Sequence, residues 1–175
     1  MKSKKSWKEK LLNSKNLPRV EKISEKMEKR WGKGSVAIPS PKEIDDIMRM
    51  VPEGKVITFD EIREFLAKKY NATLGCPITT GLFACIAANA SIEDENNGIK
   101  DINPYWRTLK SGGFLNEKYP GGIARQKERL EKEGHSILSK GKKYFVENYK
   151  EKLFKLWFVG EAILSNEDTY NRRWN

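Results

Sequence analysis

Histidine and cysteine are scarce in this 175-residue chain, which holds one His and two Cys. With His135 as the only imidazole, the sequence predicts no metal site and no cofactor, and a Ser-His-Asp triad would have a single candidate base. Cys76 and Cys85 form neither a C-x-x-C motif nor a disulfide framework. We therefore expect a reducing, cytoplasmic setting.

Long apolar runs are also lacking. No stretch approaches the roughly 20 residues that cross a bilayer, and no apolar segment follows the lysine-rich start, so no membrane partner is expected. Residues 1–34 hold twelve Lys and Arg against four Glu, a net of +8 out of +10 for the whole chain. Such an arm favours a polyanionic partner, above all nucleic acid, and the alternative is a solubilising, solvated surface.

The two ends of the chain are expected to add helices to a central domain. Two short basic helices are predicted over residues 5–13 and 19–31, and an amphipathic helix over roughly Lys152–Leu164. Glycine and proline residues between the second helix and residue 41 indicate a boundary. The predicted parts are a basic extension (1–34), a main domain (35–148), and a C-terminal helix and tail (149–175).

The main domain has the pattern of a helix-turn-helix with a small β-hairpin. One helix is expected to begin at Ser40-Pro41, where a capping residue precedes proline, and a second at Thr58. A third helix, of small residues, is expected over Thr79–Ala90. Ser136–Leu138 and Tyr144–Val146 flank a Lys-Gly-Lys-Lys turn and predict a hairpin. The expected fold class is mainly α: a winged-helix-like helix-turn-helix domain with additional terminal helices.

The most informative segment is Asn103-Pro104-Tyr105-Trp106-Arg107. Together with Tyr119-Pro120-Gly121-Gly122 downstream, it resembles the reactive-site region of the O6-alkylguanine-DNA alkyltransferase family. Residues 51–59 (VPEGKVITF) are similar to that family's "IP-x-G-x-V-x-T-Y" segment, and residues 130–135 to its closing "L-x-x-E-G-H". The resemblance covers residues 41–135, with the elements in the family's order.

The chemistry of this segment departs from that family. The family carries Pro-Cys-His-Arg, and its cysteine thiolate takes an alkyl group from a damaged base. Here Tyr105 stands at the cysteine position and Trp106 at the histidine position. A phenol with an ordinary pKa near ~10 is a poor nucleophile at neutral pH. The resemblance therefore implies a non-catalytic DNA-binding protein, similar to the alkyltransferase-like branch that binds alkylated guanine without an acceptor cysteine.

The resemblance also assigns site residues. The predicted DNA contacts are Phe59, Thr79, Thr80, Asn89 and Arg107. The predicted base pocket comprises Pro104, Tyr105, Trp106, Tyr119, Gly121 and Gly122. Asn89 is expected to end or hinge the recognition helix, and Arg107 has the alternative role of tying its loop to a carboxylate. The acidic segment Ala90–Asn103 is expected to loop away from phosphates.

Two alternatives of other classes stay open. One is an alkyl transferase with a non-standard acceptor, Cys85 or Cys76, although a buried inert thiol is the simpler interpretation of Cys85. The other is a winged-helix regulator, on DNA or RNA, with a vestigial pocket. The expected partners are double-stranded DNA, intact or alkylated, and other repair proteins. An open cavity beside Tyr105 would favour lesion recognition, because stacking of a base on an aromatic ring is worth roughly 1–3 kcal/mol.

Overall fold

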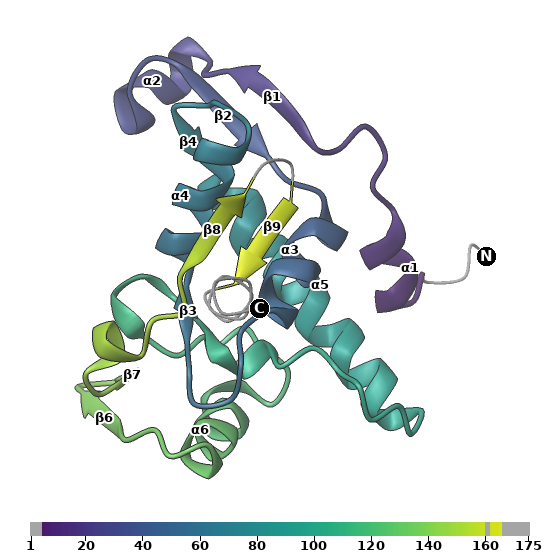
Figure 1. The fold of residues 1–175 in the computed structure, drawn as a ribbon, viewed down its shortest axis with the longest axis vertical. Helices are drawn as coiled ribbons and strands as arrows, with labels where there is room; N and C mark the ends of the chain where they lie inside the picture. Colours follow the sequence, from purple (N-terminus) through teal and green to yellow (C-terminus); the bar gives the residue numbers. More distant parts are fainter. Residues whose placement is uncertain (1–4, 160–161, 166–175) are drawn as a thin grey trace.

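The computed structural model describes residues 5–159 and 162–165. In this part of the chain, six α-helices carry most of the regular structure (Figure 1). The helices are α1 (Trp7–Leu12), α2 (Glu25–Trp31), α3 (Pro41–Arg49), α4 (Phe59–Lys69), α5 (Pro77–Asn96) and α6 (Gly122–Lys132). The strands are β1 (Arg19–Lys22), β2 (Ser35–Ile38), β3 (Ile57–Thr58), β4 (Leu74–Gly75), β5 (Thr108–Leu109), β6 (Ile137–Lys140), β7 (Lys143–Val146), β8 (Leu156–Val159) and β9 (Ala162–Ser165). Short 3-10 turns are η1 (Tyr105–Arg107), η2 (Ser111–Gly113) and η3 (Tyr149–Lys152). The mainly α prediction is confirmed.

Helices α3, α4 and α5 form the core, and their starts follow from local sequence. The Ser40 hydroxyl accepts a hydrogen bond from the Glu43 backbone N–H, and Pro41 occupies the first turn of α3. Thr58 and Glu61 cap each other's backbone at the start of α4. These caps satisfy N–H groups that a helix leaves unpaired. The buried residues between the helices include Ile44, Ile47, Met48, Ile62, Phe65, Leu66, Phe83, Ala84 and Ala87.

A tight turn joins α4 to α5 and completes the helix-turn-helix. Strand β4 runs through this turn and pairs in parallel with β2, which itself pairs antiparallel with β1. A Cβ on Gly75 would lie 2.6 Å from the Arg63 carbonyl oxygen, so only glycine lets the turn approach α4 this closely. The parallel pair β3–β5 links the start of α4 to the segment after η1.

The N-terminal region differs from the prediction. Residues 19–31 form a strand and a helix, β1 and α2, and the prediction of one helix over 19–31 is wrong. Val20 lies opposite Ala37 of β2, so pairing with a sheet edge overrides helix propensity at Arg19–Lys22. Helix α1 packs on α3 and α5, where Leu11 is buried in the main core. The extension thus shares a core with the main domain.

The C-terminal helix predicted over Lys152–Leu164 is also wrong. Leu156–Val159 and Ala162–Ser165 pair as the antiparallel strands β8 and β9. The sequence Leu-Trp-Phe-Val is rich in residues that favour strands, and Gly160 interrupts the helical pattern. By contrast, the hairpin predicted around residues 136–146 is confirmed as β6 and β7.

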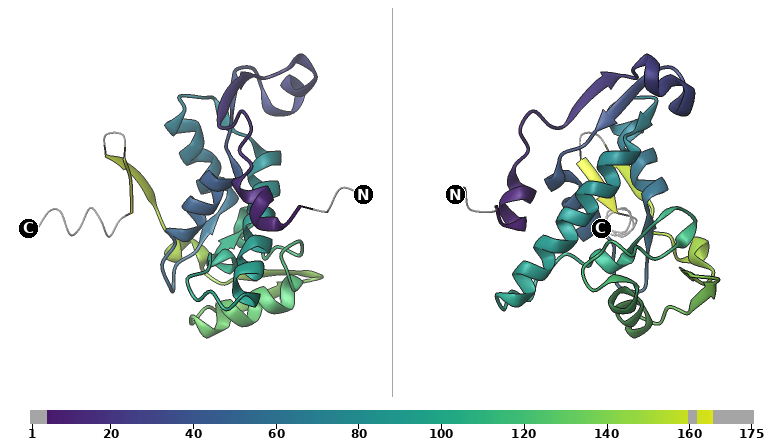
Figure 2. Two further views of the ribbon diagram at one scale, coloured as in Figure 1. Left: turned by 90° about the vertical axis from the view of Figure 1, so that its right-hand side faces the viewer. Right: turned by 180° about the vertical axis from the view of Figure 1, so that it is seen from behind.

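The basic elements gather on one side of the molecule. Seen from behind, α5 crosses the centre, with α1 to its left and the β6–β7 hairpin at the lower right (Figure 2, right). The side view shows α1 and β6–β7 pointing the same way, whereas β8–β9 project from the opposite side (Figure 2, left). Within the described residues, no helix is long and apolar enough to cross a membrane.

Candidate nucleic-acid interface

The N-terminal part of α5 presents a surface without charge. Its residues from Pro77 to Ala90 include no Lys, Arg, Asp or Glu. Ile78 and Leu82 are 59% and 55% exposed, and Thr79, Gly81, Cys85, Ile86 and Asn89 are partly exposed. A helix of uncharged side chains at the surface of a basic protein can approach a polyanion without a repulsive group.

Thr80 does not belong to this surface. Its side chain is fully buried, and its hydroxyl donates a hydrogen bond to the Cys76 carbonyl at 2.8 Å. Thr80 lies three and four residues before Phe83 and Ala84, on the stripe that faces the core. The prediction that Thr80 contacts DNA is therefore contradicted by its position.

Phe59 contacts α5 from the start of α4, and Asn89 lies within α5 itself. Phe59 begins α4, and its partly buried ring lies beside Gly81 of α5. A Cβ added to Gly81 would lie 3.8 Å from the Phe59 ring. Asn89 lies inside α5, where its Nδ2 donates to the Cys85 carbonyl at 2.8 Å. Because α5 continues to Asn96, the predictions that the helix ends at Ala90 and that Asn89 ends or hinges it are wrong, and residues 90–96 of the segment expected to loop away from phosphates are helical.

The predicted base pocket is filled by its own aromatic side chains. Tyr105 is 0% exposed, and its ring packs edge-on against Trp106 at 5.5 Å and Tyr119 at 5.4 Å between centroids. Tyr119 is 2% exposed, and Gly121 and Gly122 turn the chain into α6 with positive φ. Burial raises the pKa of both phenols, so they stay neutral at neutral pH. The predicted residues come together, but around a packed ring.

Trp106 and Arg107 line a groove beside α6. The Trp106 ring lies 4.5 Å from the Arg129 guanidinium carbon, at the edge of a groove of about 580 Å³. Arg107 donates from two nitrogens to Glu133 and from Nη1 to the Val51 carbonyl at 2.7 Å. Arg107 is therefore held in a structural ion pair. This position matches its alternative role and not a DNA contact.

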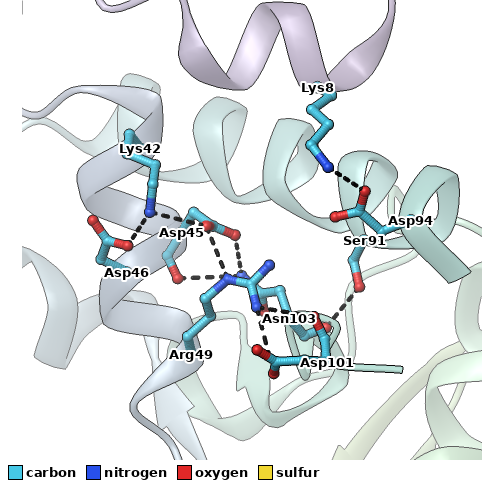
Figure 3. Close-up of polar contacts among 9 residues, drawn as sticks. All are labelled: Lys8, Lys42, Asp45, Asp46, Arg49, Ser91, Asp94, Asp101 and Asn103. Atoms are coloured by element: carbon cyan, nitrogen blue, oxygen red, sulfur yellow. Dashed lines mark hydrogen bonds and ion pairs between the residues drawn. The ribbon is translucent and has the colours of Figure 1, made fainter. Parts of the chain in front are cut away.

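A polar network that the sequence did not reveal fixes the start of this segment (Figure 3). The Asn103 side chain donates to Asp45 Oδ1 at 2.6 Å, and the Asn103 carbonyl accepts from Ser91 Oγ at 2.8 Å. Arg49 pairs with the other Asp45 oxygen at 3.0 Å. The sequence signal was Asp45 itself, a charged residue between Ile44 and Ile47 on the apolar stripe of α3, because a buried carboxylate requires partners.

The acidic residues of α5 are occupied within the protein. The Glu93 carboxylate accepts from the first backbone N–H groups of α1, and Asp94 pairs with Lys8 at 2.7 Å. Glu95 pairs with Arg125 and Arg129 of α6 at 2.9 and 2.7 Å. These pairs neutralise the acidic turn that would otherwise repel phosphate.

The N-terminal region keeps cations without such partners. Within the described residues, no ion pair involves Lys5, Lys15, Lys22, Lys26, Lys29, Arg30 or Lys33. Helix α2 is attached beside the start of α5, because Ile23, Met27 and Trp31 pack with Cys76. This places free positive charge next to a helix N-terminus, which itself favours anions.

Neither cysteine has the environment of a nucleophile. Cys76 is buried in the small cluster with Ile23 and Val36. Cys85 is half-buried, and burial raises the pKa of its thiol although the Asn116 amide, 4.0 Å away, opposes the shift. Among the described residues, no group of His, Cys, Asp and Glu could hold a metal ion.

Comparisons with known proteins give a weak likeness. No protein-family model and no curated protein matches the chain. Two solved structures are similar: S. pombe Atl1 in complex with damaged DNA containing O6-carboxymethylguanine, and S. pombe ATL in complex with DNA. Each is 22% identical, covers 68% of this chain and 94% of its own, and has a TM-score of 0.48. At this level the function has to be argued from the residues of this chain.

Proposed function

We propose that the protein binds duplex DNA without catalysis, as a divergent relative of the alkyltransferase-like type. The observation that carries this proposal is the uncharged surface of α5 with the free cations of α2 beside its first turn. Duplex DNA carries a dense line of phosphates, and lysines that neutralise them release counterions and supply sequence-independent affinity. An uncharged helix next to those lysines can then lie against a groove.

The filled pocket makes the proposal more specific. An extruded base would have to displace Tyr105, which is fully buried against Tyr119 and Trp106. Truncating a buried aromatic side chain to Ala typically costs about 3–5 kcal/mol, and on this scale the packing of Tyr105 outweighs the roughly 1–3 kcal/mol that stacking on one base returns. We therefore expect intact duplex and duplex containing O6-alkylguanine to bind with affinities within about ten-fold of each other.

The N-terminal charge is tested by substitution, because deletion would also remove Leu11 from the core and β1 from the sheet. The test variant changes four exposed cations of the α2 region to Gln: Lys26, Lys29, Arg30 and Lys33. The control variant changes four exposed lysines elsewhere to Gln: Lys55, Lys68, Lys100 and Lys155. Fluorescence anisotropy with one labelled duplex gives Kd over a range of salt concentrations for each protein.

The α2 variant should bind more weakly, and its log–log salt slope should fall by about 0.9 for each phosphate that the protein no longer neutralises. The control should keep most of the wild-type slope. Equal slopes for the two variants, or no duplex binding by the wild type, would overturn the proposal. A preference above about ten-fold for alkylated duplex would show that Tyr105 leaves its pocket. A mass gain on Cys85 or Cys76 after incubation with alkylated DNA would establish the transferase alternative.

A further inference from the structure

The β6–β7 hairpin is firmly attached at its base and exposed at its tip. Val146 is buried in a second cluster with Leu109 and Leu130. The Leu115 backbone N–H donates to the Tyr144 carbonyl at 2.9 Å, and the rings of Phe114 and Phe145 meet edge-on at 5.8 Å. The segment that follows β5 is thereby joined to β7. The hairpin is held as a rigid projection from the helix-turn-helix body.

The tip of the hairpin concentrates positive charge, and this charge lowers the stability of the β6–β7 pair. Lys140 and Lys143 lie directly opposite each other in the β6–β7 register, and Lys142 is in the turn between them. Like charges opposite each other destabilise a strand pair. Within the described residues none of these three lysines has an ion-pair partner, whereas Lys110 nearby pairs with Glu117 at 3.0 Å. Among the residues that the structure describes, no acidic side chain compensates this repulsion by an ion pair.

A groove of about 390 Å³ lies between this tip and the segment after β5. Its lining includes Lys110, Phe114, Glu117, Lys142, Lys143 and Tyr144. The Lys143 ammonium lies 5.7 Å from the centroid of Phe114, and that of Lys127 lies 5.9 Å from Tyr144. These distances are at the outer limit of a cation–π contact, so the Lys143 ammonium, which has no ion-pair partner among the described residues, can turn toward an anion with little loss.

We propose that the groove and the hairpin tip bind the sugar–phosphate backbone of duplex DNA. They would contact the duplex beside the stretch of DNA that α5 contacts under the proposed function. This inference rests on the proposed function and adds a second, separate contact region. Charge complementarity favours phosphate. Lys142 and Lys143 line the groove without an ion-pair partner among the described residues, Lys140 lies beside them at the hairpin tip, and the one acidic group of the lining, Glu117, is already paired. The hairpin also points to the same side of the molecule as α1 (Figure 2). A bound phosphate would relieve the repulsion between Lys140 and Lys143.

The test variant is Lys140→Ala with Lys142→Ala, which removes the repulsion between Lys140 and Lys143 and one of the two unpaired lysines of the groove, and keeps Lys143. Its matched control is Lys55→Ala with Lys155→Ala, two exposed lysines away from the groove with the same change in net charge. We expect the hairpin variant to bind a long duplex about ten-fold more weakly at low salt, with a salt slope lower by about 0.9 for each phosphate left unneutralised. Its thermal midpoint should be unchanged or higher. The control should keep wild-type affinity.

Duplexes of increasing length separate the two contact regions. The wild type should gain affinity with length until the duplex spans both α5 and the hairpin, and the hairpin variant should reach its maximum on a shorter duplex. If the wild type binds duplex and the hairpin variant binds equally well at every length, the hairpin contact is overturned while the proposed function stands. If the hairpin variant loses affinity for single-stranded DNA alone, the proposed contact with duplex DNA is overturned as well. If the wild type binds no duplex, both proposals fail.

Discussion

The carboxylate of Glu133 accepts a hydrogen bond from the indole Nε1 of Trp106 at 2.7 Å. The same carboxylate receives the guanidinium of Arg107, with side-chain exposures of 7% for Glu133 and 14% for Arg107. Glu133 lies at the end of α6, and Trp106 and Arg107 belong to η1. One acidic group thus fixes η1, the turn that begins with the buried Tyr105.

Replacing Glu133 with Ala should therefore be strongly destabilising. The change leaves the largely buried Arg107 guanidinium without its carboxylate and the Trp106 N–H without its acceptor, and breaking a buried pair from one side costs about 3–5 kcal/mol. Urea unfolding followed by fluorescence measures the change in the free energy of unfolding. Glu131→Ala is the control, because Glu131 is exposed and its pair with Lys127 at 3.7 Å is worth at most about 1 kcal/mol. Equal losses in the two variants would contradict a structural role for the Glu133 pair.

The fold could be predicted where local chemistry determines it. The caps at Ser40 and Thr58 are local signals, and the helices α3 and α4 begin where the sequence predicts. Strand β1 could not be predicted, because its extended form depends on pairing with β2, which comes later in the chain. Leu156–Val159 has apolar residues that fit a helix face or a strand equally well, and its partner strand decides the outcome.

The sequence predicted which residues lie together at the site better than it predicted how they are arranged. The resemblance brings Tyr105, Trp106 and Tyr119 into one neighbourhood, and the structure places their rings in contact. The resemblance could not show that the Tyr105 ring fills the expected base pocket. Whether the pocket is filled depends on the volumes of side chains from three segments of the chain. The resemblance also places Thr80 at the surface, although its spacing from Phe83 and Ala84 already indicates the core.

His135 should make stability depend on pH. The imidazole is 3% exposed, and neither ring nitrogen has a hydrogen-bond partner among the described residues. Burial lowers the pKa of His135 below its ordinary 6.5, Lys152 and Arg107 lower it further, and Glu133 opposes them. The unfolded chain therefore takes up a proton as the pH falls through 6.5, while the folded chain resists it. Stability should fall from about pH 7 downward and be unaffected by this group at higher pH.

The measurement for His135 compares wild type with His135→Gln by urea unfolding between about pH 8 and 5. The difference between the two proteins isolates the imidazole, since the carboxylates titrate in both. Wild type should lose stability relative to the variant by up to about 1.4 kcal/mol per pH unit below its unfolded pKa. Parallel curves across this range would show that His135 is protonated equally in both states.

Gly75 should be intolerant of even a methyl group. A Cβ at this position would lie 2.6 Å from the Arg63 carbonyl oxygen and 2.8 Å from its Cα, and both atoms belong to the backbone of α4. Gly75→Ala therefore has to push the turn away from α4, which we expect to cost about 1–3 kcal/mol of stability.

Gly81→Ala is the matched control within α5, because its Cβ would meet only the Phe59 ring at 3.8 Å, an ordinary contact. That change should stabilise the helix by about 0.5–1 kcal/mol. Thermal unfolding of both variants measures the contrast, and a Gly75→Ala protein as stable as Gly81→Ala would show that the turn can move without cost.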